Sequence, residues 1–273
     1  MRENLNEACV LLGGQKTGAV VGFKYGMQMS GVVPMAEQVV SLVKLQHIPS
    51  LRLYDPNPAA LSALSGSGVT VAVSIPNTQL LSVGQSNASA ANWVKNNVAA
   101  YLPNTNITTI IVGNEVFTSL PNAALVLLPA MKYLYSALSS FNLQNQVKIT
   151  TTLSTSLILD SFPPSQAFFN KSITTSLLQP MLSFLAATGS FAMFNVYPYD
   201  VYKSGAGIIT LDYALFKPLP SGAEIVDSNT LLAYTNLFDA ILDSAYFALA
   251  KLNLSSLPIA VAETGWPYQG DTD

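Results

Sequence analysis

The chain has 273 residues, of which 50% are hydrophobic and only 10% are charged, and its formal net charge is −3 at pH 7. Because soluble domains usually carry about 25% charged residues, this composition favours one compact domain stabilised by a large buried core. The 12 basic residues are scattered, so the sequence offers no positive surface for nucleic acid or anionic lipid. A neutral polymer suits such a surface better.

The ends of the chain and its single cysteine limit the remaining classes of protein that the sequence can encode. Cys9 is the only cysteine, which excludes an intramolecular disulfide and a zinc site built from cysteines. No uninterrupted apolar run approaches the roughly 18 residues that span a bilayer, so we expect no transmembrane segment. The charged start around Glu3 and Glu7 differs from a signal peptide, and we treat residues 1–19 as an atypical leader and 20–273 as the domain. Four sequons weakly favour a secretory route, at Asn87, Asn106, Asn170 and Asn253.

Apolar, β-branched runs alternate with helical patterns along the whole chain. Most of these runs are continuously apolar, as buried parallel strands are. The predicted strands are residues 19–26, 50–55, 69–75, 107–115, 148–154, 191–199 and 258–263. Apolar residues three and four apart predict one helix from Ala124 to Leu138 and another from Tyr234 to Leu252. Residues 227–229, Asp-Ser-Asn, offer the N-cap of the second helix.

This alternation of strands and helices predicts an α/β fold with a parallel sheet, either open or closed as a (β/α)8 TIM barrel. Polar and aromatic residues follow most of the predicted strands, and in a closed barrel those strand ends meet at one face. An open nucleotide-binding sheet would need a glycine-rich first turn. Neither "GGQKTG" at 13–18 nor "GSGVTV" at 66–71 has the required order, so the barrel is favoured.

Two glutamates stand at the carboxyl ends of predicted strands. Glu115 ends the run in "IIVGNEV" and Glu263 ends the run in "IAVAETG". Two carboxyl groups across a barrel mouth are the minimum for glycoside hydrolysis, which needs one proton donor and one nucleophile or base. Either glutamate alone would be explained as the solvated end of a strand. The pair, with Asn114 before one and Trp266 after the other, favours a catalytic interpretation.

Aromatic and amide side chains at the strand ends suit the binding of sugar rings, whose flat C–H faces stack on aromatic rings. Packing between strand and helix is the alternative role for each aromatic residue. The candidate substrate-binding residues are Tyr25, Tyr54, Asn114, Asn195, Tyr197 and Trp266, and Tyr199 is a further aromatic at the same kind of position.

Five segments together resemble a known family: "LRLYDPNP", "VGNEV", "FNVYPY", "FDAILDSAYFAL" and "AETGWPYQGD". In this order and spacing they are similar to the plant glucan endo-1,3-β-glucosidases of glycoside hydrolase family 17, over about residues 20–273. The resemblance implies a retaining endo-hydrolase of β-1,3-glucan, such as callose, that needs no cofactor and no metal. It implies that Glu115 is the acid/base, that Glu263 is the nucleophile, and that Tyr25 and Tyr197 line the cleft. It also implies secretion to the cell wall or outer plasma-membrane surface and a role in plant defence.

Two departures from the family pattern bear on this expectation. The pattern continues through a seventh helix, an eighth strand and a final helix, whereas this chain ends at Asp273, and the usual signal peptide is replaced by the charged leader. The resemblance therefore predicts an incomplete barrel with unpaired edges beside its first and seventh strands, and impaired activity. The alternatives are a protein that binds β-glucan without cleaving it and, less favoured, a scaffold whose outer helices bind protein.

Overall fold

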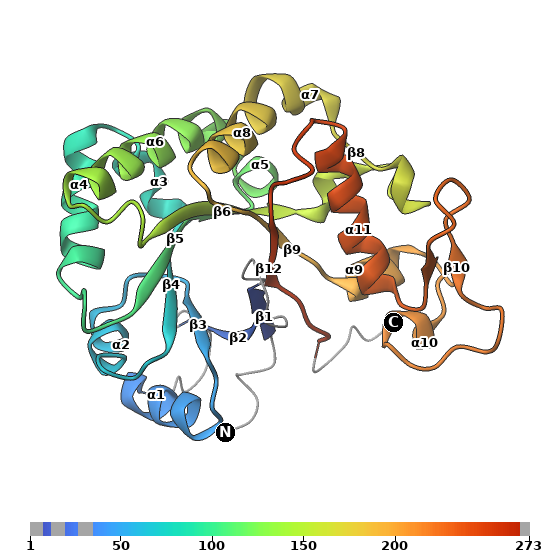
Figure 1. Cartoon of the computed structure of the whole chain (residues 1–273), viewed down its shortest axis with the longest axis horizontal. Helices are drawn as coiled ribbons and strands as arrows, with labels where there is room; N and C mark the ends of the chain where they lie inside the picture. Colours follow the sequence, from blue (N-terminus) through green and yellow to red (C-terminus); the bar gives the residue numbers. More distant parts are fainter. Residues whose placement is uncertain (1–7, 12–19, 27–34, 268–273) are drawn as a thin grey trace.

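The structure is a computed structural model that describes residues 8–11, 20–26 and 35–267. Strands form a closed barrel at its centre, and helices surround much of the outside (Figure 1). In order around the barrel the strands run β1-β12-β9-β6-β5-β4-β3-β2. Their bounds are β1 (Ala8–Leu11), β2 (Val20–Tyr25), β3 (Ser50–Leu53), β4 (Thr70–Ile75), β5 (Ile107–Asn114), β6 (Lys148–Ser154), β9 (Ala192–Asn195) and β12 (Ile259–Glu263).

The seven predicted strands are all present as β2, β3, β4, β5, β6, β9 and β12, and neighbours among them pair in parallel. This arrangement confirms the predicted TIM-type barrel. Within residues 8–11, 20–26 and 35–267, no parallel strand follows β12. The expected incompleteness of the parallel barrel is confirmed as well.

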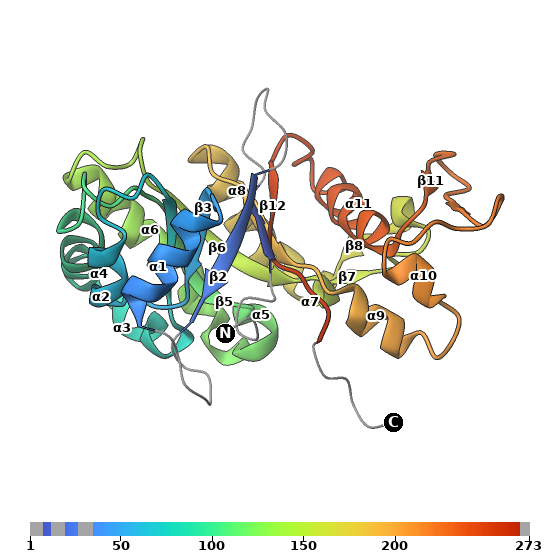
Figure 2. The same ribbon diagram turned by 90° about the horizontal axis from the view of Figure 1, so that it is seen from below.

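The eighth position around the barrel is filled by β1, which runs antiparallel to both of its neighbours (Figure 2). Val10 lies opposite Val21 of β2 and opposite Val261 of β12. The expectation of unpaired edges beside the first and seventh parallel strands is therefore wrong. Folding back onto β2 as an antiparallel neighbour lets β1 pair with backbone groups that an open edge would leave exposed. Part of the predicted leader thus contributes a strand to the barrel.

Helices connect the barrel strands, and a longer excursion between β9 and α11 carries α9, α10 and a small hairpin (Figure 1). The helices are α1 (Ala36–Leu45), α2 (Pro58–Ala63), α3 (Leu80–Val83), α4 (Asn87–Val94), α5 (Val116–Ser119), α6 (Ala124–Ser140), α7 (Lys171–Ile173), α8 (Gln179–Ala187), α9 (Pro198–Ser204), α10 (Leu211–Ala214) and α11 (Leu237–Ala250). Two short strand pairs lie outside the barrel: β7 (Ile158–Leu159) with β8 (Phe168–Phe169), and β10 (Ile225–Val226) with β11 (Ala233–Tyr234).

The two predicted helices are present as α6 and α11, but α11 begins later than expected. Its N-cap is Asn236, whose side chain accepts a hydrogen bond from the backbone N–H of Asp239, and Tyr234 belongs to β11. The N-cap predicted at residues 227–229 is wrong. The buried carboxylate of Asp227 instead accepts hydrogen bonds from the backbone and hydroxyl of Ser165, which ties this hairpin to the turn between β7 and β8.

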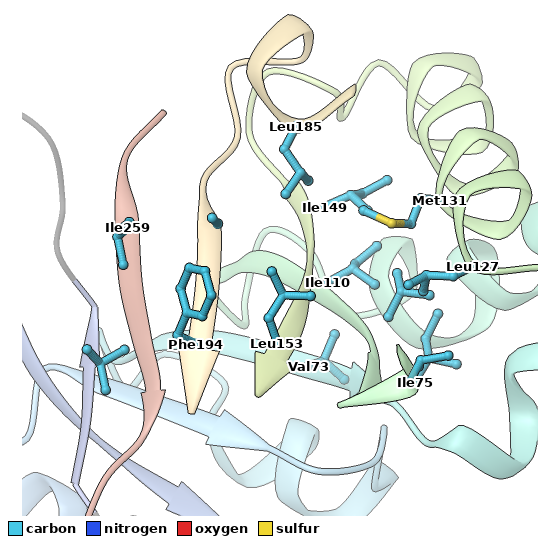
Figure 3. Close-up of a cluster of buried hydrophobic side chains, with 14 of the residues drawn as sticks. Val73, Ile75, Ile110, Leu127, Met131, Ile149, Leu153, Leu185, Phe194 and Ile259 are labelled. Carbon is cyan, nitrogen blue, oxygen red and sulfur yellow. The ribbon is translucent and has the colours of Figure 1, made fainter. Parts of the chain in front are cut away.

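The core lies between the outer face of the barrel and the helices, as Figure 3 shows for one cluster. In that cluster Leu127 and Met131 of α6 point toward Ile110 and Ile149 on the strands. A second cluster comprises Ala72, Ile111, Met193, Ala260 and Ala262, the residues that alternate with the outward-facing ones on the same strands. Side chains alternate along strands, so one set faces the helices and the other faces the barrel interior.

The segment Pro121–Ser140, which contains α6, is long and apolar enough to cross a membrane by length and composition alone. The sequence-level expectation of no transmembrane segment relied on uninterrupted apolar runs and overlooked this segment. In the structure, one face of α6 is buried, with Leu127, Met131, Leu134 and Leu138 nearly inaccessible to solvent. This packing is that of an amphipathic core helix.

We expect the antiparallel closure by β1 to contribute measurably to stability. Proline lacks a backbone N–H and disrupts a strand that has neighbours on both sides, so Val10→Pro should separate β1 from β2 and β12. Unsatisfied backbone groups should lower the free energy of unfolding by about 1 to 3 kcal/mol, measured by urea denaturation. Val10→Thr, which keeps the N–H and β-branching, is the control, and equal stability of the two variants would contradict the role of β1.

Candidate active site

The two predicted catalytic glutamates lie at the carboxyl ends of barrel strands. Glu263 is the last residue of β12, and Glu115 directly follows β5. The carboxyl ends of parallel barrel strands meet at one face, which is where barrel enzymes hold their sites. Among the residues that the structure describes, no group of three or more His, Cys, Asp or Glu side chains is placed to hold a metal ion.

Four side chains surround the carboxylate of Glu263, whose side chain is only 10% exposed. Its Oε1 accepts hydrogen bonds from Nη1 of Arg52 at 2.8 Å and from the hydroxyl of Tyr54 at 2.7 Å. Its Oε2 accepts one from the hydroxyl of Tyr197 at 2.7 Å and lies 3.5 Å from Nζ of Lys24. Both carboxylate oxygens are therefore held, each by one cation and one tyrosine.

These contacts determine the charge of Glu263. Burial alone would raise the pKa of its carboxyl group, but the charges of Arg52 and Lys24, with the two tyrosine hydroxyls, hold this pKa below its ordinary value. Burial and the negative charge of Glu263 raise the pKa of Tyr197, so its hydroxyl keeps its proton and remains a donor. Glu263 is thus held as a carboxylate at neutral pH, the form that a nucleophile needs.

Arg52 lies inside the barrel and links strands on opposite sides of the site. Its side chain is fully buried, and besides Glu263 it bonds Oδ1 of Asn114 at 3.0 Å and the backbone oxygen of Ala262 at 3.4 Å. It also lies beneath Tyr54, with its Cζ 4.5 Å from the ring centroid. The sequence analysis missed Arg52 and Lys24. A charged residue in the middle of the apolar run "SLRLYD", in a chain with few charges, was the signal for Arg52.

The backbone around Glu115 is in a conformation that few residues adopt. Glu115 has φ 50° and ψ 40°, in the left-handed region, and Gly113 has φ 70° with no space for a Cβ beside Val116. The side chain of Asn77 holds the segment from both sides: its Oδ1 accepts from the N–H of Asn114 at 2.7 Å and its Nδ2 donates to that residue's backbone oxygen at 2.9 Å. Strained backbone of this kind is concentrated at functional sites. Asn77 was also missed by the sequence analysis.

The carboxyl group of Glu115 has a different environment from that of Glu263. Asn195 donates its Nδ2 hydrogen to Oε1 of Glu115 at 2.7 Å, and the hydroxyl of Thr118 lies 3.4 Å from Oε2. Glu115 forms no ion pair within the described part of the chain. Oδ1 of Asn195 is buried and has no hydrogen-bond partner among the described residues. Two carboxyl groups in such unlike surroundings are suited to different roles.

The structure brings four of the six predicted substrate-binding residues to this network: Tyr54 and Tyr197 at Glu263, Asn195 at Glu115, and Asn114 between them. Tyr25 instead belongs to the hydrophobic core at 8% exposure, where burial and the nearby carboxylates of Asp55 and Glu37 raise its pKa. It is the preceding residue, Lys24, that reaches Glu263. The binding roles themselves stay predictions.

Trp266 lies just beyond β12 and packs against α9. Its ring centroid is 5.1 Å from that of Tyr199, at 77°, and 5.8 Å from that of Tyr202. The Trp266 side chain is half-buried, so part of its surface is accessible to solvent. Packing on α9 and contact with a ligand are therefore compatible roles for this ring.

Comparison with known proteins identifies the family. Residues 21–273 match the sequence profile described as "Glycosyl hydrolases family 17". The chain belongs to this family. It is 53% identical over 256 residues to glucan endo-1,3-beta-glucosidase 2 of Arabidopsis thaliana, covering 94% of this chain and 50% of that protein. It is 54% identical over 252 residues to glucan endo-1,3-beta-glucosidase 3 of the same plant, covering 92% and 50%. The chain spans about half the length of the curated relatives it matches.

Two solved structures are similar to this family 17 chain over most of its length. One is CJP38, described as a beta-1,3-glucanase and allergen of Cryptomeria japonica pollen, with a TM-score of 0.85, 40% identity, and coverage of 92% of this chain and 76% of that chain. The other comes from a study of two plant beta-glucan endohydrolases with distinct substrate specificities, with a TM-score of 0.84, 37% identity, and coverage of 92% and 78%. These matches confirm the family resemblance and the barrel fold.

We expect the buried pair of Arg52 and Glu263 to make the stability of this family 17 barrel depend on pH. Because the pKa of Glu263 is lowered in the folded state, its contribution is present above the pKa of an unfolded glutamate and is lost as the pH falls through the folded pKa. Arg52→Met removes the fully buried partner of this carboxylate and leaves Lys24 at 3.5 Å, which should lower the free energy of unfolding at about pH 7 by up to about 3 to 5 kcal/mol. The deficit should shrink toward about pH 4, because Glu263 can then take up a proton.

Urea denaturation at both pH values measures this effect. The double variant Arg52→Met/Glu263→Gln, which removes both charges, should be less destabilised at about pH 7 than Arg52→Met alone. Equal losses at the two pH values, together with no relief in the double variant, would show that Arg52 acts through packing rather than charge.

Proposed function

We propose that the chain is a retaining endo-hydrolase of β-1,3-glucan in which Glu263 is the nucleophile and Glu115 is the acid/base. The observation that carries this proposal is the contrast between the two carboxyl groups: Glu263 is held by two cations and two hydroxyls, whereas Glu115 has an amide and a hydroxyl. The names of the Arabidopsis relatives support the substrate class, and the few charges of the chain suit a neutral polysaccharide.

In the first step a carboxylate oxygen of Glu263 attacks the anomeric carbon of a glucosyl residue. The bond from that carbon to the leaving oxygen breaks while Glu115 transfers its proton to this oxygen, and a covalent glycosyl-enzyme forms. In the second step Glu115 takes a proton from water, whose oxygen attacks the same carbon and releases Glu263. Two inversions retain the configuration. We expect the two carboxyl groups to lie about 5 to 5.5 Å apart in a ligand-bound structure.

Asn114 supports this arrangement through the orientation of its side chain. Its Oδ1 accepts hydrogen bonds from Arg52 at 3.0 Å and from the hydroxyl of Thr152 at 2.7 Å. With the oxygen engaged in this way, Nδ2 is the part of the amide that can donate to a sugar hydroxyl. We propose that it donates to the 2-hydroxyl of the glucosyl residue at Glu263, where such bonds strengthen as charge develops.

A second candidate function, binding of β-glucan without cleavage, is favoured by the closure of the barrel. The strand beside β12 is the antiparallel β1, and its register with β12 rests on the single pair Val10 and Val261. Because a displacement of about 1 Å can cost about a hundredfold in rate, a weakly held β12 would reduce turnover while leaving the binding surface in place. We therefore propose a turnover below that of the same domain closed by a parallel eighth strand.

Product analysis on linear β-1,3-glucan tests both candidates. We expect oligosaccharide products that initially retain the β configuration. Chromatography detects the products, and ¹H NMR measures their configuration. Glu263→Gln should abolish cleavage and keep glucan binding, because the amide cannot act as nucleophile. Glu37→Gln, an exposed site on α1, is the matched control. Binding without products from the unaltered chain would select the second candidate, and full activity of Glu263→Gln would overturn the assignment of the nucleophile.

We expect Trp266 to contribute to glucan affinity. If its accessible surface covers a sugar ring, Trp266→Ala should weaken binding of a β-1,3-gluco-oligosaccharide by roughly 1 to 3 kcal/mol, by analogy with the transfer free energy of a buried aromatic side chain. Isothermal titration calorimetry measures this change. The other tryptophan, Trp93 of α4, serves as the control through Trp93→Phe. Unchanged affinity with a lowered melting temperature would assign Trp266 to packing on α9 alone.

A further inference from the structure

Glu263 is approached by two cations although one would balance its charge. Arg52 bonds Oε1 from inside the barrel, and Lys24 lies 3.5 Å from Oε2 on the other side of the carboxylate. The Lys24 side chain is 12% exposed, while that of Arg52 is fully buried. The second cation is therefore the one nearer to solvent.

Lys24 also contacts the tyrosine that shares Oε2 with it. Its Nζ donates to the hydroxyl of Tyr197 at 3.2 Å, and that hydroxyl donates in turn to Oε2 of Glu263 at 2.7 Å. Nζ lies 5.8 Å from the ring centroid of Tyr197 and 5.9 Å from that of Tyr54. Nζ of Lys24, the hydroxyl of Tyr197 and Oε2 of Glu263 thus contact one another, and Nζ also lies close to the rings of Tyr54 and Tyr197.

The largely buried position of Lys24 near Arg52 is unfavourable for a cation unless its charge serves a role there. Burial lowers the pKa of Lys24 and the neighbouring Arg52 lowers it further, while Glu263 raises it. An uncharged residue at position 24 would avoid this desolvation cost. The electrostatic attraction between Lys24 and Glu263 opposes this desolvation cost.

We propose that Lys24 is a positioning residue for Glu263, whose ammonium group holds Oε2 and the hydroxyl of Tyr197 in a fixed arrangement. The inference takes Glu263 as the reacting carboxylate of the proposed function. Arg52 fixes Oε1 and the orientation of the carboxylate within the barrel, and Lys24 fixes the opposite oxygen. Without Lys24, Oε2 keeps the hydrogen bond from the Tyr197 hydroxyl and loses the cation that lies 3.5 Å away.

A consequence is that Lys24 extends the charged state of Glu263 to lower pH. The groups that face Glu263 are Lys24 of β2, Arg52 of β3, Tyr54 after β3 and Tyr197 after β9. Glu115 follows β5 directly after Asn114, the residue that Arg52 bonds, and its own carboxyl group bonds Asn195. Since an opposite charge favours the ionised carboxyl group, removing Lys24 makes Glu263 take up a proton at a higher pH than in the unaltered chain.

The test is a ¹³C NMR titration of the full chain labelled at the glutamate carboxyl carbons, with the Glu263 signal assigned through Glu263→Gln. In Lys24→Met we expect its titration midpoint to move up by about one pH unit, the lower end of the shift caused by a charge within 4 to 6 Å. Lys24→Arg should stay near the unaltered chain because it keeps the charge. Lys95→Met removes an exposed lysine at the end of α4 and should leave the midpoint unchanged.

Coincident Glu263 titrations in Lys24→Met and the unaltered chain, down to the lowest pH at which both are folded, would overturn the proposal. A lowered melting temperature of Lys24→Met without a moved midpoint would do the same, because it would assign Lys24 to packing. Lys24→Gln repeats the test if Lys24→Met does not fold. The titration requires no turnover, so a chain that cleaves no glucan would refute the proposed function and leave this inference to be decided by the midpoint. In a chain that cleaves glucan, the acid limb of kcat/KM should move with the midpoint.

Discussion

The ion pair between Arg52 and Glu263 inside the barrel is the interaction on which the rest of the site depends. Removing a guanidinium and a carboxylate from water is costly, and the cost is offset only where every remaining donor and lone pair finds a partner. Here those partners come from β4, β5 and β12 and from the tyrosines that follow β3 and β9. Small neighbours such as Ala72 and Ala262 leave the interior open enough for the long arginine side chain. The barrel therefore has to close for the charge pair to exist.

The two carboxyl groups show how environment separates chemically identical residues. Glu263 is the last residue of β12, where the pairing with β9 shifts register between Val261 and Glu263, and its carboxylate meets Arg52 inside the barrel. Glu115 lies one residue beyond its strand, where a left-handed turn held by Asn77 directs the chain into α5. Its carboxyl group meets Asn195 rather than a cation. The difference in role proposed for the two glutamates follows from these backbone paths.

Closure of the barrel has an unexpected source. The family match begins at residue 21, whereas β1 spans Ala8–Leu11 and lies before it. A strand from outside the family match thus occupies the position between β2 and β12. Antiparallel pairing needs only a short connection from β1 to β2, while a parallel strand would need a crossover of a dozen residues or more. The position beside the strand of Glu263 is therefore the part of the fold that differs from a regular eightfold parallel barrel.

The sequence by itself determined the seven parallel strands, the helices α6 and α11 and the positions of Glu115 and Glu263, because apolar periodicity and strand-end residues are local signals. Only the tertiary structure decided which side chains meet. Lys24 and Tyr25 are neighbours in the sequence, yet alternation along β2 directs one to Glu263 and the other into the core. Arg52 and Glu263 are 211 residues apart in the sequence. The strands β1 and β12, which pair with each other, also lie far apart in the sequence, and no local pattern specifies such contacts. Which strand lies beside which is set by closure of the whole barrel, and the charge of Glu263 depends on that closure.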